Sequence, residues 1–117
     1  MMKNALFFFV LGIITGVMAV ELFSQIPKRH TIFYDGLMFS PELLVIRFGD
    51  SVTVYNNSTK AMEVAAGKHE NHKNLQGFEE KIVKPETTYT FTPLEKGAFD
   101  FHDHLNPKKL GILAIDE

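Results

Sequence analysis

Four of the five histidines in the chain fall into two short motifs, KHENH and FHDHLNP, which supply His69 and His72 and then His102 and His104. Imidazole is the commonest side-chain metal ligand. Residues two apart on a strand share a face, so His102 and His104 can converge on one ion. His69 and His72 lie three apart, a spacing that a helical turn or tight loop brings to one side. The sequence therefore predicts one mononuclear metal site. The alternative is that these are solvated loop histidines and strand-end histidines bonded to backbone carbonyls.

Three further polar residues accompany the histidines and are the accessory groups of the predicted site: Asp103, Glu70 and Asn106. In a regular strand Asp103 must point away from its two histidine neighbours. These residues offer acid, base or hydrogen-bonding groups, but no nucleophile constellation is present. The sequence therefore favours a metal-binding protein over an enzyme.

Short strands must position these motifs. Alternating or β-branched runs predict strands over residues 30–34, 43–48, 51–55, 62–65, 87–92, 97–102 and 111–115. Turns every 8 to 12 residues are typical of an all-β sandwich. Residues 66–81 show no strand pattern and are predicted to form a long, functional loop. The alternation also predicts a core containing Phe33, Phe39, Phe48, Phe91, Phe99 and Phe101.

The N-terminus carries an uncharged apolar run over residues 5–20, preceded by Lys3 and closed by Glu21. Its length lies between those of a signal-peptide core and a spanning helix. We therefore expect residues 1–23 to form a membrane anchor or a signal peptide, 24–29 a tether and 30–117 the folded domain. Either alternative exports the domain, to the periplasm or cell exterior on a membrane helix, or as a secreted protein.

Composition narrows the choice of partners. The chain has 117 residues, with 12 Lys+Arg against 14 Asp+Glu for a net charge of −2. The charges are interspersed, which argues against a nucleic-acid partner. With no cysteine, disulfides, zinc-thiolate sites and iron–sulfur clusters are excluded. Four neutral imidazoles suit Cu(II) or Zn(II), and the usual affinity order favours copper.

From Phe39 to Ile115 the sequence resembles the cupredoxins. The segments PETTYTF, GAFDF and Pro107 with GIL fall where that family has P-G-E-x-Y-x-F, G-x-Y-x-F and H-P-x-M-x-G. The resemblance implies a Greek-key β-sandwich. It does not carry over the family's blue-copper ligands, because Met62 and Asn106 occupy the two histidine positions, Asp103 the cysteine position, and Lys109 or Leu110 the methionine position.

The histidine motifs look like those of a cysteine-free branch of bacterial cupredoxin-like proteins, which has a P-H-P-x-H loop and an H-D-H-L-N-P strand end. The prolines of that loop are absent here. The resemblance implies an exported copper protein for copper handling or sequestration, and not a blue-copper electron carrier. Two alternatives stay open: a mononuclear copper redox enzyme, and a metal-free module that binds a protein partner of unknown identity.

Overall fold

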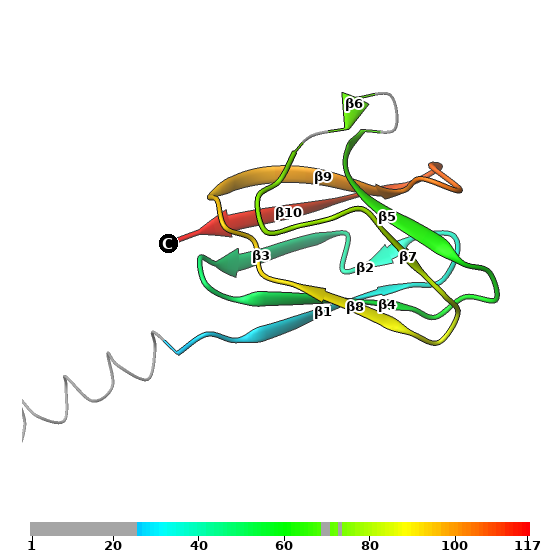
Figure 1. The fold of residues 1–117 in the computed structure, drawn as a ribbon, viewed down its shortest axis with the longest axis horizontal. Helices are drawn as coiled ribbons and strands as arrows, with labels where there is room; N and C mark the ends of the chain where they lie inside the picture. The colour runs from blue at the N-terminus through cyan, green and yellow to red at the C-terminus, as the bar shows by residue number, and fades with distance from the viewer. Residues whose placement is uncertain (1–25, 69–70, 73) are drawn as a thin grey trace, which may run out of the picture.

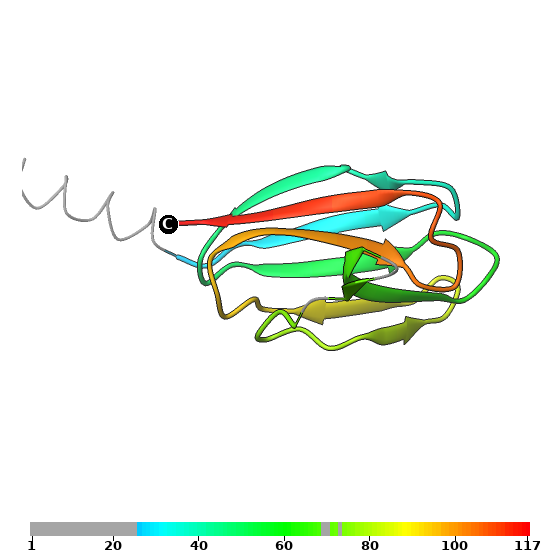
Figure 2. The ribbon, with the colours of Figure 1, turned by 90° about the horizontal axis from the view of Figure 1, so that it is seen from above.

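The computed structural model describes residues 26–68, 71, 72 and 74–117. This part of the chain folds as two β-sheets packed face to face, which confirms the predicted all-β sandwich (Figures 1 and 2). Its strands, in chain order, are β1 (Arg29–Tyr34), β2 (Phe39–Ser40), β3 (Leu43–Arg47), β4 (Ser51–Asn56), β5 (Met62–Lys68), β6 (Asn71–His72), β7 (Lys81–Val83), β8 (Thr88–Phe91), β9 (Gly97–Asp103) and β10 (Leu110–Asp116).

One sheet has the strand order β2-β1-β4-β8. The other has the order β3-β10-β9-β5-β6, and β7 also pairs with β5. The chain passes repeatedly between the two sheets, so strands distant in sequence become neighbours. Two such pairs, β1 with β4 and β3 with β10, run parallel, an arrangement that a tight hairpin cannot connect.

The core lies between the sheets and follows the predicted alternation. On β4, Val52 and Val54 are buried against the facing sheet. Phe39 and Phe101 pack edge to face, with ring centroids 4.7 Å apart. Gly111 lies opposite Phe101 on the neighbouring strand, where a side chain would collide with the ring. The Phe101 ring therefore takes the space that a larger residue at position 111 would occupy.

Two of the six expected core phenylalanines are outside the core. Phe33 is 49% exposed because Ile32 and Tyr34 take the inward positions of β1, which leaves Phe33 packed edge to face on Tyr55 at the outer surface. Phe48 is 47% exposed because it follows the end of β3 and lies in the turn leading to β4.

The prediction of a strand-free segment over residues 66–81 is wrong at both ends. Strand β5 continues through Lys68, and β7 begins at Lys81. Strand β6, which ends at His72, adds a short pairing onto β5 within the segment. The sequence hides the continuation of β5 because Ala66 and Gly67 lack the β-branched or aromatic side chains that mark a strand.

The predicted membrane or signal segment, residues 1–23, lies outside the described residues, as does the beginning of the tether. Within residues 26–68, 71, 72 and 74–117, no helix is long and apolar enough to cross a membrane.

Candidate metal centre

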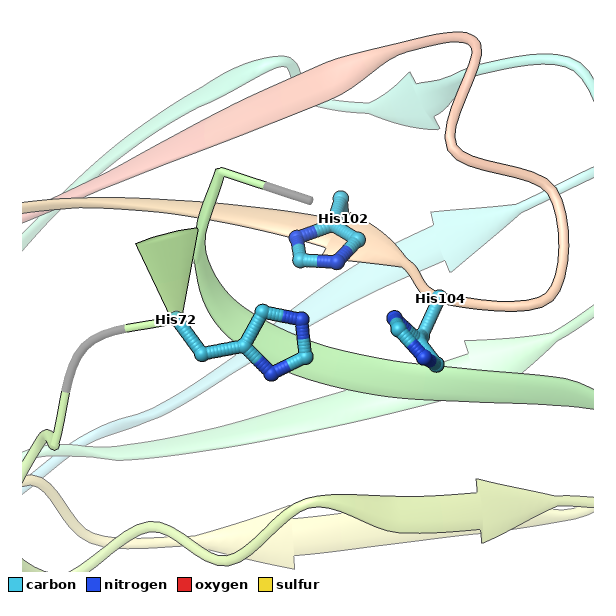
Figure 3. Close-up of side chains that lie close together, drawn as sticks. All are labelled: His72, His102 and His104. Atoms are coloured by element: carbon cyan, nitrogen blue, oxygen red, sulfur yellow. The ribbon is translucent and has the colours of Figure 1, made fainter. Parts of the chain in front are cut away.

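Three of the four predicted ligand histidines lie together in the structure. His72 comes from β6, His102 from β9, and His104 from the residues directly after β9. Each offers a ring nitrogen, and these nitrogens all lie within 4.8 Å of one another. The ring centroid of His72 lies 4.9 Å from that of His102 and 4.8 Å from that of His104. Figure 3 shows the three rings side by side. Loop and strand motifs more than 25 residues apart in the sequence thus form one cluster.

The cluster lies on the outer face of the sheet that contains β5 and β9. Strand β5 runs between β6 and β9, with Ala65 opposite His102 and Gly67 opposite His72. Paired residues of antiparallel strands project to the same face. The small side chains of Ala65 and Gly67 therefore lie beside the imidazoles on that face. Gly67 also has a φ of +86°, a backbone conformation that favours glycine. His102 is fully buried although it faces outward, and the His72 ring packs against it.

Two of the three imidazoles are held by hydrogen bonds from their Nδ1 atoms. His102 Nδ1 lies 2.7 Å from the carbonyl oxygen of Gly67. A carbonyl only accepts, so Nδ1 carries the proton and the lone pair of this ring is on Nε2. His72 Nδ1 donates to the carboxylate of Glu80, which selects the same tautomer. An outer partner on Nδ1 that orients the ring is the usual arrangement of a metal-ligating histidine.

Asp103 points away from the imidazoles, as the strand period predicts. It is 3% exposed, and its Oδ2 accepts a hydrogen bond of 2.8 Å from the Tyr34 hydroxyl on the opposite sheet. Burial, the bond to Asp103 and the negative charge of that carboxylate raise the pKa of Tyr34, so the hydroxyl remains a donor. The Asn106 side chain also turns toward this region and donates to the Gly36 carbonyl at 3.2 Å. Asp103 and Asn106 therefore contact the interior and the turn after β1.

Two further predicted residues, the ligand His69 and the accessory Glu70, lie outside the described residues. The structure adds two groups that sequence reasoning missed, the carboxylate of Glu80 and the carbonyl of Gly67. Glu80 lies eight residues after His72, and no regular spacing rule connects the two. Its position within the long segment that carries His72 was the only available signal.

The donor set fits a metal ion. Ligating imidazole nitrogens lie about 2.0–2.1 Å from a metal, which places two ligands on one ion roughly 2.8–4.2 Å apart for angles from a right angle to a straight line. The ring nitrogens lie within 4.8 Å of one another, so a modest approach brings them to this separation, and His72 is exposed. A set of three neutral imidazoles, with Nδ1 bonds that order His72 and His102, suits Cu(II) or Zn(II) and leaves a coordination position open.

No protein-family model and no curated protein matches the sequence. Solved structures do match the fold. A purple cupredoxin from Nitrosopumilus maritimus has 18% identity and a TM-score of 0.64, and the match covers 74% of this chain and 99% of that one. A reduced amicyanin variant has 20% identity and a TM-score of 0.63 over 75% and 82% of the two chains. The Cu(I) form of another amicyanin variant has 20% identity and a TM-score of 0.62 over the same shares.

These identities establish similarity of fold, while function has to be argued from the site. The described part of the chain has the cupredoxin fold, in a protein without cysteine, with three histidines clustered on the outer face of one sheet.

Proposed function

We propose that this protein binds one copper ion through His72, His102 and His104, with His69 as a fourth ligand, and serves copper handling or sequestration outside the cytoplasm. The single observation that carries the proposal is the convergence of three imidazoles from β6 and the end of β9. The Nδ1 bonds of His72 and His102 support it, because they order the rings before any ion arrives.

Copper is preferred over zinc on two grounds. The affinity of imidazole sites for divalent ions rises to copper and falls again at zinc. A structural neighbour of the same fold is a Cu(I) form of amicyanin.

Attachment to a membrane through residues 1–23, or secretion after their cleavage, is the part of the proposal that rests on the sequence alone.

A blue-copper electron carrier is not the proposed function. A blue site requires a cysteine thiolate, and this chain has no cysteine. The position that the cupredoxin resemblance assigns to the thiolate holds Asp103, whose carboxylate is bonded to Tyr34 and to the backbone. The proposed copper site lies on the other side of β9.

A mononuclear copper redox enzyme is the second candidate. It is favoured by the three described ligands, because three protein ligands leave a position at which a small molecule can bind. Copper would supply one-electron chemistry there, while the chain would hold the imidazoles in place. Binding of azide to the copper-loaded protein, followed by its visible spectrum, separates an open site from one that His69 closes.

The binding proposal is tested by titration calorimetry of the full chain with Cu(II). We expect one ion per chain, and loss of tight binding when His102 and His104 are both changed to alanine. His30→Ala is the matched control, because His30 pairs with Asp50 and lies outside the cluster. Unchanged affinity in the double variant would contradict the proposal.

A further inference from the structure

Asp103 lies between the two histidines of the FHDHLNP motif. Its side chain faces the interior, on the side of the sheet opposite the imidazole rings. We propose that Asp103 is the positioning residue of the histidine cluster: its buried carboxylate fixes the end of β9 so that His102 and His104 face His72. This role matters for function only if the cluster binds a metal, as proposed above. Asp103 itself is not proposed as a ligand.

Both carboxylate oxygens of Asp103 are engaged. Oδ1 accepts the backbone N–H groups of Glu63 at 2.9 Å and of Leu105 at 3.1 Å. Oδ2 accepts the Tyr34 hydroxyl at 2.8 Å. One side chain therefore connects the neighbouring strand β5, the turn after β9, and strand β1 of the opposite sheet.

These bonds enclose His104 from both sides. The His104 N–H donates to the Glu63 carbonyl at 2.7 Å, so Glu63 bonds to Asp103 through its own N–H and to His104 through its carbonyl. The Leu105 N–H is bonded to the Asp103 side chain, and the Asn106 N–H to the Asp103 carbonyl at 3.0 Å. His104 follows the last residue of β9, so the turn built on Asp103 fixes the backbone from which its ring extends.

The two histidines differ in how the strand holds them. His102 is within β9 and is held by the ladder to β5 and by Gly67, whereas His104 is past the strand end and is half-buried. A carboxylate bonded to two backbone N–H groups is a stronger restraint than a turn of backbone bonds alone, because bonds to an ionised acceptor are about twice as strong as neutral ones. Asp103 thereby extends the order of the strand by the residues that carry His104.

The test compares Asp103→Ala with Asp50→Ala in the full chain. Asp50 is a matched control, since it is 4% exposed and its carboxylate accepts bonds from the Lys28 and Arg47 N–H groups and pairs with His30. It contacts the beginning of β1, whereas Asp103 contacts the last residue of β1, so the two carboxylates act at opposite ends of that strand.

The first measurement is NMR of the metal-free protein. Ring protons of His72 and His104, whose centroids are 4.8 Å apart, should give cross-relaxation in the wild type and in Asp50→Ala. We expect this signal to be lost in Asp103→Ala and restored in Asp103→Asn, because the asparagine oxygen still accepts both backbone N–H groups. Asp103→Leu is the second variant, since it fills the buried volume while removing both acceptors.

The second measurement is Cu(II) affinity with the electron paramagnetic resonance spectrum of the bound ion. Misplacing the ligand His104 should cost at least as much affinity as losing an outer partner of a ligand, which costs about 10–100-fold. We expect this loss, together with a changed copper hyperfine splitting, in Asp103→Ala only. Retention of the ring contacts and wild-type affinity in Asp103→Ala and Asp103→Leu would overturn the proposal, as would an equal loss in Asp50→Ala. A wild-type protein that binds no copper would refute the proposed function, while the ring contacts would still decide the role of Asp103.

Discussion

Glu80→Gln tests the second ordered imidazole of the cluster. The substitution keeps the shape of the side chain and an acceptor oxygen but removes the charge that fixes the proton on His72 Nδ1. An amide can present its NH₂ group to Nδ1 as readily as its oxygen, so the ring loses its tautomer preference. Nε2 then carries a proton in part of the population, and this proton must leave Nε2 before that nitrogen can bind the metal.

The expected magnitudes separate this effect from general destabilisation. Removing an outer-shell partner lowers metal affinity by about 10–100-fold, which corresponds to about 1.4–2.8 kcal/mol. The His72 and Glu80 side chains are 28% and 44% exposed, and even a fully charged pair at such exposure contributes only about 0–1 kcal/mol to folding. We therefore expect the metal dissociation constant to change far more than the free energy of unfolding of the metal-free protein.

The assay is Cu(II) titration calorimetry alongside urea unfolding of the metal-free chain. Glu79→Gln is the matched control, because it removes the same charge one residue away, where the side chain is exposed and the backbone N–H donates to the Tyr89 hydroxyl. Equal losses of affinity in both variants would mean that long-range charge alone acts on the ion. Unchanged affinity in Glu80→Gln would refute the argument that Glu80 orients His72.

Three further predictions follow from the fold around the site. Gly111→Ala should lower the free energy of unfolding by about 1–3 kcal/mol in urea, because the added Cβ would lie 2.1 Å from Cζ of Phe101; an unchanged midpoint would contradict this packing. Burial by itself raises the pKa of Asp50, but its bonds to two backbone N–H groups and an imidazole lower the pKa overall, so the stability it contributes is present above its unfolded pKa of about 3.9 and is lost as pH falls through the folded pKa. Acid unfolding followed by circular dichroism should show a shallower loss below about pH 4 in Asp50→Asn, and parallel curves would refute this. Asp103→Cys should bind Cu(II) without intense blue absorption, because a thiolate at position 103 faces the core on the side of β9 opposite His102; a blue variant would show that an imidazole already approaches that position.

The strands with strong alternation were predictable from sequence, and the small-residue strand was not. Strands β4, β9 and β10 fall within one residue of the expected ranges, because β-branched and aromatic residues alternate there. The continuation of β5 was not predicted because Ala66 and Gly67 lack the β-branched or aromatic side chains that mark a strand.

The ligand set was partly predictable for a similar reason. The spacing of His102 and His104 follows from the two-residue strand period, which also turned Asp103 inward. The pairing of His72 with Glu80 depends on how the segment between β5 and β7 folds back on the sheet, and no local pattern encodes it. The metal-binding character of the histidines could be predicted from residue type. Their hydrogen-bond partners, Glu80 and Gly67, could be identified only from the three-dimensional structure.

Elemental analysis of the full chain, purified from its own cells without added metal, tests the copper proposal most directly. We predict one copper ion per chain in the wild type and its loss in the variant with His102→Ala and His104→Ala. Copper below one tenth of an equivalent in the wild type, or an equivalent of zinc in its place, would contradict the proposal.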